Sequence, residues 1–234
     1  MRRFYFILLL FITVFGSNAQ TASNPYNLPL VNSMEAYKAL VLADSSNSMI
    51  DLEAFIPSIV LDIRYAGSHN FTRQKIYTHA RAFVRRPVAK ALLKVQQSLD
   101  SIGLGLKIYD AYRPYQASLK FFEVYPDTSF VAAPWQGSRH NRGAAVDVSL
   151  IDKKSRLEVQ MPTKFDDFSA AAAPDYNNLP DEARHNRKLL IDVMKKHGFS
   201  VYPTEWWHFD FQGWEKFGLL DLSFEQLDSL FRAE

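Results

Sequence analysis

The stretch SRHNRGAAVDVSL, residues 138–150, combines residue types that bind metal ions and polar substrates. His140 and Asp147 can meet if the chain bends at Gly143, because glycine adopts backbone conformations that other residues rarely reach. An imidazole nitrogen and a carboxylate oxygen are both ligands of catalytic zinc. This stretch therefore predicts part of a metal site at the entrance of an apolar strand.

A second stretch, TEWWHFDF at residues 204–211, offers Glu205 and His208 beside two tryptophans. The two stretches together supply two imidazoles, one ligand carboxylate and one further carboxylate. Catalytic zinc commonly takes three protein ligands and leaves a fourth position for water, and a carboxylate outside that shell can take a proton from the water. The residue types alone leave open the alternative that both histidines are hydrogen-bonded core residues, because such spacings also arise by chance.

Strand geometry limits how the second stretch can act. In an ideal strand the side chains of Glu205 and His208 point to opposite faces, because successive side chains alternate. Both can face one metal ion only if Glu205 lies in the bend after Pro203 or if the strand is bulged. We expect the bend. The other histidines are expected to be ordinary surface or helix-end residues: His69, His79, His185 and His197.

The segment YDAYRP, residues 109–114, places Arg113 at the end of a predicted strand and directly before Pro114. A guanidinium group is always charged, so Arg113 could stabilise the oxygen that becomes negative when water adds to a carbonyl group. The alternative is a structural salt bridge, for which Asp110 is the nearest partner.

These residues must be positioned by short strands and longer helices. Proline in the first turn, an apolar face and a final glycine predict a helix over residues 85–103, and Ser223 with Gln226 predicts a capping box on the last helix. Further helices are expected over 33–41, 115–125 and 181–198, strands over 59–67, 104–114, 144–152, 199–203 and 205–211, and a long irregular loop over 153–180. Because these elements lack a regular β-α-β rhythm, we predict an α+β fold. The expected domain has a mainly antiparallel central sheet flanked by helices, with the zinc site at the sheet.

Residues 1–19 have a basic start, an apolar run and small residues before the expected cleavage site, which predicts a signal peptide. The alternative is an uncleaved membrane anchor, but the apolar run is shorter than the roughly 20 residues that cross a bilayer. The net charge of +2 comes from Arg2 and Arg3, so residues 20–234 are balanced and indicate no nucleic-acid or anionic-membrane partner. The chain has no cysteine, so a metal site must use histidine and carboxylate. We expect one domain, residues 20–234, that is periplasmic or secreted and has no stable membrane anchor.

Several blocks are similar to those of one enzyme family. SRHNRGAAVD is similar to the SxHxxGxAxD motif of zinc D,D-peptidases, EWWHFDF to their later ExxH block, and YDAYRP to the block with the arginine. RYAGSHNF resembles RYAxxxNF, MPTKFDDF resembles the MGTxFD loop of the dipeptidase branch, and NRKLLIDVMKKHGF resembles the helix before the catalytic strand. In this order, over roughly residues 50–215, the blocks make the chain resemble the D-alanyl-D-alanine dipeptidases, the VanX-type zinc peptidases related to zinc D,D-carboxypeptidases.

The resemblance implies roles for the matching residues. It implies zinc ligands at His140, Asp147 and His208. It also implies a general base at Glu205 and a transition-state arginine at Arg113.

The resemblance further implies that Ser138 and Asp166 engage the free amino terminus of the substrate. An anionic Asp166 facing an ammonium group would favour a dipeptide over a longer chain, because a blocked substrate would leave the charge unpaired. Pro162 stands where MGTxFD has glycine, which restricts this loop and puts strict dipeptide selectivity in question.

The function implied is hydrolysis of D-Ala-D-Ala, or a close D,D-dipeptide, to free D-amino acids. The reaction would use one Zn²⁺ per chain, a water activated by the metal and Glu205 as the general base. One alternative is a peptidoglycan D,D- or L,D-carboxypeptidase with a more open pocket. Another is a non-catalytic zinc-containing binding module, against which Glu205 and Arg113 argue because binding alone needs neither.

Overall fold

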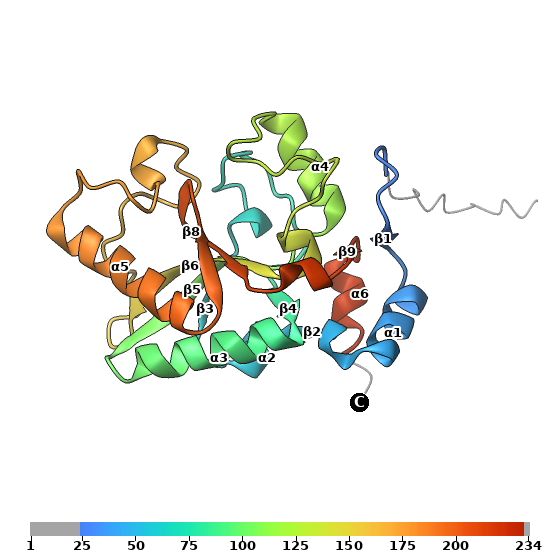
Figure 1. The fold of residues 1–234 in the computed structure, drawn as a ribbon, viewed down its shortest axis with the longest axis horizontal. Helices are drawn as coiled ribbons and strands as arrows, with labels where there is room; N and C mark the ends of the chain where they lie inside the picture. Colours follow the sequence, from blue (N-terminus) through green and yellow to red (C-terminus); the bar gives the residue numbers. More distant parts are fainter. Residues whose placement is uncertain (1–23, 232–234) are drawn as a thin grey trace, which may run out of the picture.

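The protein is described here by a computed structural model over residues 24–231, and the predicted signal peptide lies outside these described residues. Its centre is a five-stranded sheet with the strand order β3-β5-β6-β8-β7 (Figure 1). The strands are β3 (Val60–Leu61), β5 (Leu104–Asp110), β6 (Ala145–Asp152), β7 (Phe199–Tyr202) and β8 (Glu205–Phe211). Only β3 and β5 pair in parallel within this sheet, so the predicted α+β fold with a mainly antiparallel sheet is confirmed.

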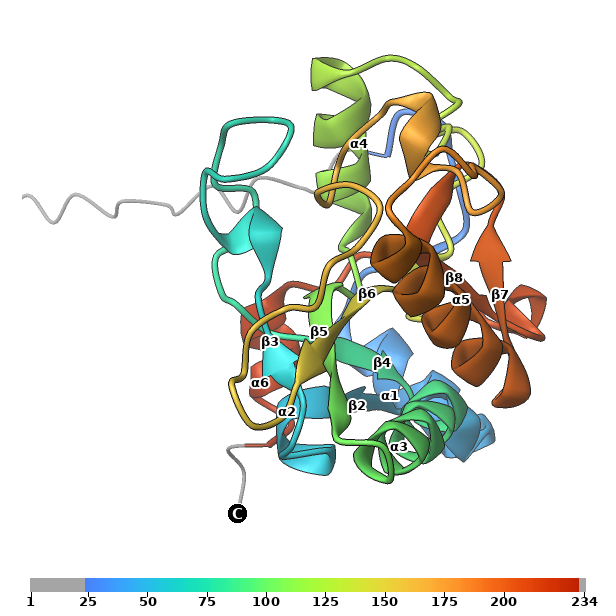
Figure 2. The same cartoon turned by 90° about the vertical axis from the view of Figure 1, so that its left-hand side faces the viewer.

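Three helices flank the sheet. α3 (Arg86–Asp100) packs against β5, and α5 (Asp181–Lys196) packs against β7 and against α3. α4 (Tyr115–Val124) lies on the opposite side of the sheet from α3 in both views (Figures 1 and 2). The apolar face predicted for α3 is buried. α3 therefore covers one face of the sheet, and the site lies on the other face, on the side of α4.

Smaller elements join the two ends of the described chain. β1 (Leu30–Val31) pairs in parallel with β9 (Leu219–Leu220), and β2 (Met49–Asp51) pairs with β4 (Phe83–Arg85). The remaining helices are α1 (Met34–Ala43), α2 (Leu52–Phe55) and α6 (Phe224–Asp228), whose predicted capping box is present. The buried guanidinium of Arg85 donates to the carbonyls of Asn47, Arg142 and Gly218, and so binds together early, middle and late segments.

Two predicted strands are shorter than expected. The strand predicted over 59–67 is limited to Val60–Leu61, because the chain then forms a single 3₁₀ turn that buries Tyr65. The strand predicted over 104–114 ends at Asp110, because the next amides leave the sheet and that of Arg113 donates to the carbonyl of His140. Residues 153–180 form the expected irregular loop, interrupted by one 3₁₀ turn.

Within residues 24–231, none of the helices has the length and apolar character that a membrane span requires.

Candidate active site

The candidate site is organised around Asp147 in the middle of the sheet. Asp147 lies in β6, and its direct cross-strand partners are Asp110 in β5 and His208 in β8. Directly paired residues on neighbouring strands project to the same face, so all three side chains point to the α4 side. A register shift between Ile108 and Asp110 helps to aim Asp110 there.

His140 reaches the same point from a 3₁₀ turn before β6. The turn spans His140–Arg142 and is closed by Gly143, which has a φ of +66°. A Cβ atom at Gly143 would lie 2.9 Å from the Cε of Met49, so both the conformation and the space favour glycine. The bend expected between His140 and Asp147 is therefore present.

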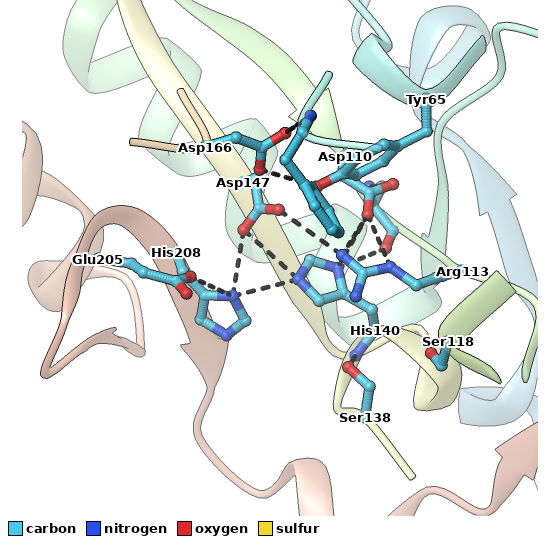
Figure 3. A network of polar contacts seen from close by, with 12 residues as sticks. Tyr65, Asp110, Arg113, Ser118, Ser138, His140, Asp147, Asp166, Glu205 and His208 are labelled. Carbon is cyan, nitrogen blue, oxygen red and sulfur yellow. Dashed lines mark hydrogen bonds and ion pairs between the residues drawn. The ribbon is translucent and has the colours of Figure 1, made fainter. Parts of the chain in front are cut away.

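Three possible metal-ligand atoms converge at this point (Figure 3). His140 Nε2 lies 3.1 Å from His208 Nδ1, and Asp147 Oδ1 lies 3.1 Å from His208 Nδ1 and 3.4 Å from His140 Nε2. Ligand atoms around a tetrahedral zinc ion are roughly 3.3 Å apart, given bond lengths of about 2.0–2.1 Å. Asp147 Oδ1 is buried and lacks a hydrogen-bond partner within the described residues. The type and spacing of these three ligand atoms therefore fit a zinc ion.

Each imidazole is oriented by a hydrogen bond on its other nitrogen. His140 Nδ1 lies 2.7 Å from the carbonyl of Ala111, and His208 Nε2 lies 3.0 Å from Asp210 Oδ1. Both partners are acceptors, so in the neutral rings the nitrogens that contact Ala111 and Asp210 carry the hydrogen, and the nitrogens that face the cluster present lone pairs. Asp210 was not singled out from the sequence, although its position two residues after His208 on a strand places it on the same face.

The electrostatics of the cluster favour a cation. Burial alone would raise the pKa of Asp147, but the imidazoles of His140 and His208 hold it well below the usual range. Burial alone would lower the pKa of His208, but its contacts with Asp147 and Asp210 raise it well above the usual range. The centre of the cluster therefore stabilises positive charge.

Glu205 lies beside this cluster and not within it. Its Oε2 is 3.7 Å from His208 Nδ1, and burial raises its pKa to about 8. The expectation that Glu205 lies in the bend after Pro203 is wrong, because it is the first residue of β8 and pairs with Tyr202. The register of β7 and β8 shifts at this point, so the strand irregularity brings Glu205 and His208 together.

Arg113 forms the salt bridge with Asp110 that the sequence suggested, and it also lies next to the cluster. Its Nε and Nη2 contact Asp110 Oδ2 at 3.1 and 2.7 Å, so the structural salt bridge exists. Nη2 also lies 4.0 Å from Asp147 Oδ2, and the side chain lines the cavity over the site. Burial opposes its charge, but Asp110 outweighs this and raises the pKa of Arg113 well above the usual range, so the group remains a fixed cation.

A cavity of about 620 Å³ opens above the cluster and contains Asp166 in its wall. Asp166 has a left-handed φ of +60° and accepts a hydrogen bond of 2.9 Å from the hydroxyl of Tyr65. Burial raises the pKa of Asp166 to about 7. No local sequence signal links Tyr65 to Asp166, because the two residues lie far apart in the chain and meet only in the fold.

Ser138 and Asp166 both line the cavity above the cluster. Figure 3 shows them on opposite sides of the pair formed by His140 and Asp147. The hydroxyl of Ser138 accepts a hydrogen bond of 3.1 Å from the amide of His140. The role expected for Ser138 and Asp166 at the substrate's amino terminus stays a prediction.

The remaining histidines within the described chain lie away from the cluster, as expected. His197 ends α5 and contacts Ser98, and His79 contacts Glu225 near α6.

The family model and the sequence relatives agree on one family. The model of the D-Ala-D-Ala dipeptidase family, Peptidase M15, matches residues 45–222. A D-alanyl-D-alanine dipeptidase of Escherichia coli K12 is 33% identical over 165 residues, which cover 70% of this chain and 85% of that protein. The enzyme of the same name from Enterococcus faecium is 27% identical and covers 68% of this chain and 88% of its own length. Among solved structures, VanYB in complex with D-Ala-D-Ala is 14% identical, with a TM-score of 0.39 over 65% of this chain and 84% of that one.

Proposed function

Because this chain belongs to the D-Ala-D-Ala dipeptidase family of zinc metallopeptidases, we propose that it hydrolyses D-Ala-D-Ala, or a closely related D,D-dipeptide, to free D-amino acids. The observation that carries the proposal is the convergence of His140, Asp147 and His208, with donor atoms 3.1 to 3.4 Å apart, beside the buried carboxylate of Glu205.

Each residue of the site has a separate role in the proposed reaction. His140, Asp147 and His208 would hold the zinc ion, which supplies a Lewis acid for the scissile carbonyl and lowers the pKa of water. Glu205 takes the proton of the attacking water and returns it to the amine that leaves, as its raised pKa suits both steps. Arg113 stabilises the negative oxygen formed from the carbonyl. Asp166 binds the substrate's ammonium group.

The experiment that tests this function measures release of free D-alanine from D-Ala-D-Ala and from its N-acetylated form. We expect zinc-dependent release from the free dipeptide that is lost with chelator and regained with zinc. Preference for the N-acetylated peptide would favour the peptidoglycan carboxypeptidase instead. No release from either peptide, by a zinc-loaded and folded protein, would favour the non-catalytic binding module.

Replacing Arg113 by alanine is expected to lower turnover by about 100- to 1000-fold, because one donor to the developing oxyanion is lost. Asp110 would keep the hydroxyl of Tyr77 and the amide of Ala111, both at 2.9 Å, so its carboxylate retains two hydrogen bonds. Turnover, bound zinc and the melting temperature are measured together. Wild-type turnover in a folded Arg113→Ala protein would remove Arg113 from the mechanism.

The pH dependence of substrate capture is expected to report Asp166. Its pKa of about 7 means that Asp166 gains a proton and loses its charge as the pH falls below 7. The ionised fraction of Asp166 then drops by up to about tenfold per pH unit, and we expect kcat/KM for D-Ala-D-Ala to fall with it, in addition to the fall that protonation of Glu205 causes. The Asp166→Asn variant should lack this contribution, whereas Asp167→Asn should retain it. An identical profile in wild type and Asp166→Asn would contradict the role of Asp166.

A further inference from the structure

The cavity has a second charged side chain whose purpose the proposed reaction does not explain. Arg139 lies between Ser138 and His140 in the sequence and lines the same cavity. Its side chain is 35% exposed, although its Nε is buried. Its Nε lies 3.4 Å from Asp210 Oδ2, and Asp210 contacts His208 on the nitrogen that faces away from the cluster. Asp166 instead contacts Tyr65 and Phe71, so the two charged side chains are held by different parts of the cavity wall.

The guanidinium of Arg139 is held in place but its hydrogen-bonding capacity is unused. It lies over the ring of Trp214 at 4.7 Å and near the ring of Tyr202 at 5.6 Å. Its one ion pair is loose, with Nε 3.4 Å from Asp210 Oδ2, and Nε has no hydrogen-bond partner in the described part of the chain. A guanidinium group has five N–H donors in a planar fork, which matches a carboxylate.

The other cavity arginines are already occupied. Arg113 is paired with Asp110, and Nη1 of Arg142 donates to the carbonyl of Phe217 at 2.5 Å. Arg142 also packs against the ring of Trp214, at 5.4 Å, as Arg139 does. Arg142 differs from Arg139 in that its guanidinium already donates a hydrogen bond to the protein. Arg139 is therefore the cavity arginine best able to bind an anion.

We propose that Arg139 binds the free carboxylate of the residue that leaves during hydrolysis, which rests on the dipeptidase function proposed above. A dipeptide is a zwitterion with an ammonium group at one end and a carboxylate at the other. Asp166 and Arg139 supply the opposite charges in the wall of one cavity, which also contains His140, Asp147 and His208. A substrate with a blocked carboxyl group would leave the donors of Arg139 without their partner, so Arg139 selects for a free carboxyl terminus.

The competing explanation is that Arg139 acts only through Asp210, which orients His208. That role would lower the rate for every substrate equally. The carboxylate role changes the preference between substrates, so the two explanations separate when D-Ala-D-Ala is compared with its C-terminal amide.

The test measures kcat/KM for D-Ala-D-Ala and D-alanyl-D-alaninamide with zinc-loaded wild type, Arg139→Gln and Arg142→Gln. We expect wild type to prefer the acid by about 10- to 100-fold, the range for hydrogen bonds to a charged group. Arg139→Gln should lose most of this preference through a lower value for the acid, whereas Arg142→Gln should keep it. Binding of D-Ala-D-Ala to Glu205→Gln, with and without Arg139→Gln, gives a second readout that needs no turnover.

Each outcome decides a separate point. Hydrolysis of both substrates by wild type without a preference overturns the role of Arg139 and leaves the dipeptidase function intact. A preference that survives in Arg139→Gln, or is lost equally in Arg142→Gln, also overturns it. Absence of hydrolysis of either substrate by folded, zinc-loaded wild type overturns the proposed function itself.

Discussion

Replacing His208 by alanine is expected to reduce bound zinc to a small fraction of one ion per chain and D-Ala-D-Ala hydrolysis to the background rate. His208 supplies one of three donor atoms, lies 3.1 Å from both other ligands and is the direct sheet partner of Asp147. Loss of a ligand removes both the binding energy for the ion and its fixed geometry. Metal analysis and D-alanine release, with and without added zinc, measure the two losses.

Two further variants make the His208 result specific. His197→Ala removes a histidine that contacts Ser98 at the end of α5, and it should retain full zinc and activity. Asp210→Asn keeps the hydrogen bond to His208 but loses the negative charge, and should weaken zinc binding by about 10- to 100-fold. A folded His208→Ala protein with a full complement of zinc would exclude His208 as a ligand.

Replacing Glu205 by glutamine is expected to lower kcat by about 10²- to 10⁴-fold while the zinc content stays unchanged. Glutamine keeps the shape and burial of the side chain but cannot take a proton from water. Glu205 is placed next to His208 without being part of the three-atom ligand cluster, so the metal site should survive. Steady-state kinetics and metal analysis of the same preparation measure this outcome.

The control for this variant is Glu158→Gln. Glu158 is also partly buried, but it accepts a hydrogen bond of 2.6 Å from Ser149 and contacts Lys107, away from the cavity lining. Its replacement should leave kcat near the wild-type value. A Glu205→Gln enzyme with normal kcat would show that another group moves the proton, and loss of zinc in that variant would show that Glu205 supports the metal instead.

Features set by local chemistry could be predicted from the sequence. α3 follows from the proline at its start and its apolar face, and the capping box of α6 follows from Ser223 and Gln226. The residues proposed as ligands were visible because histidine and aspartate flank a glycine, whose positive φ the turn uses. Such features depend on neighbours in the sequence, so no knowledge of the fold is needed.

Features set by distant contacts could not be predicted. The strand at 59–67 is cut short because Tyr65 turns into the core and meets Asp166, about a hundred residues later. The position of Glu205 depends on a register shift between β7 and β8, which alternation alone does not reveal. The positions of Ser138 and Asp166 in one cavity wall likewise depend on the fold, because neither motif predicts where the other lies.

The parallel pairing of β1 with β9 has a consequence for how the polypeptide completes its fold during synthesis. Leu30 leaves the ribosome long before its partner Leu219, which is made 189 residues later. His208 is likewise made 61 residues after its sheet partner Asp147. A nascent chain that has not reached these residues therefore lacks the partner strand of β1 and one of the three possible metal-ligand side chains, and it cannot assemble the candidate metal site before His208 is made.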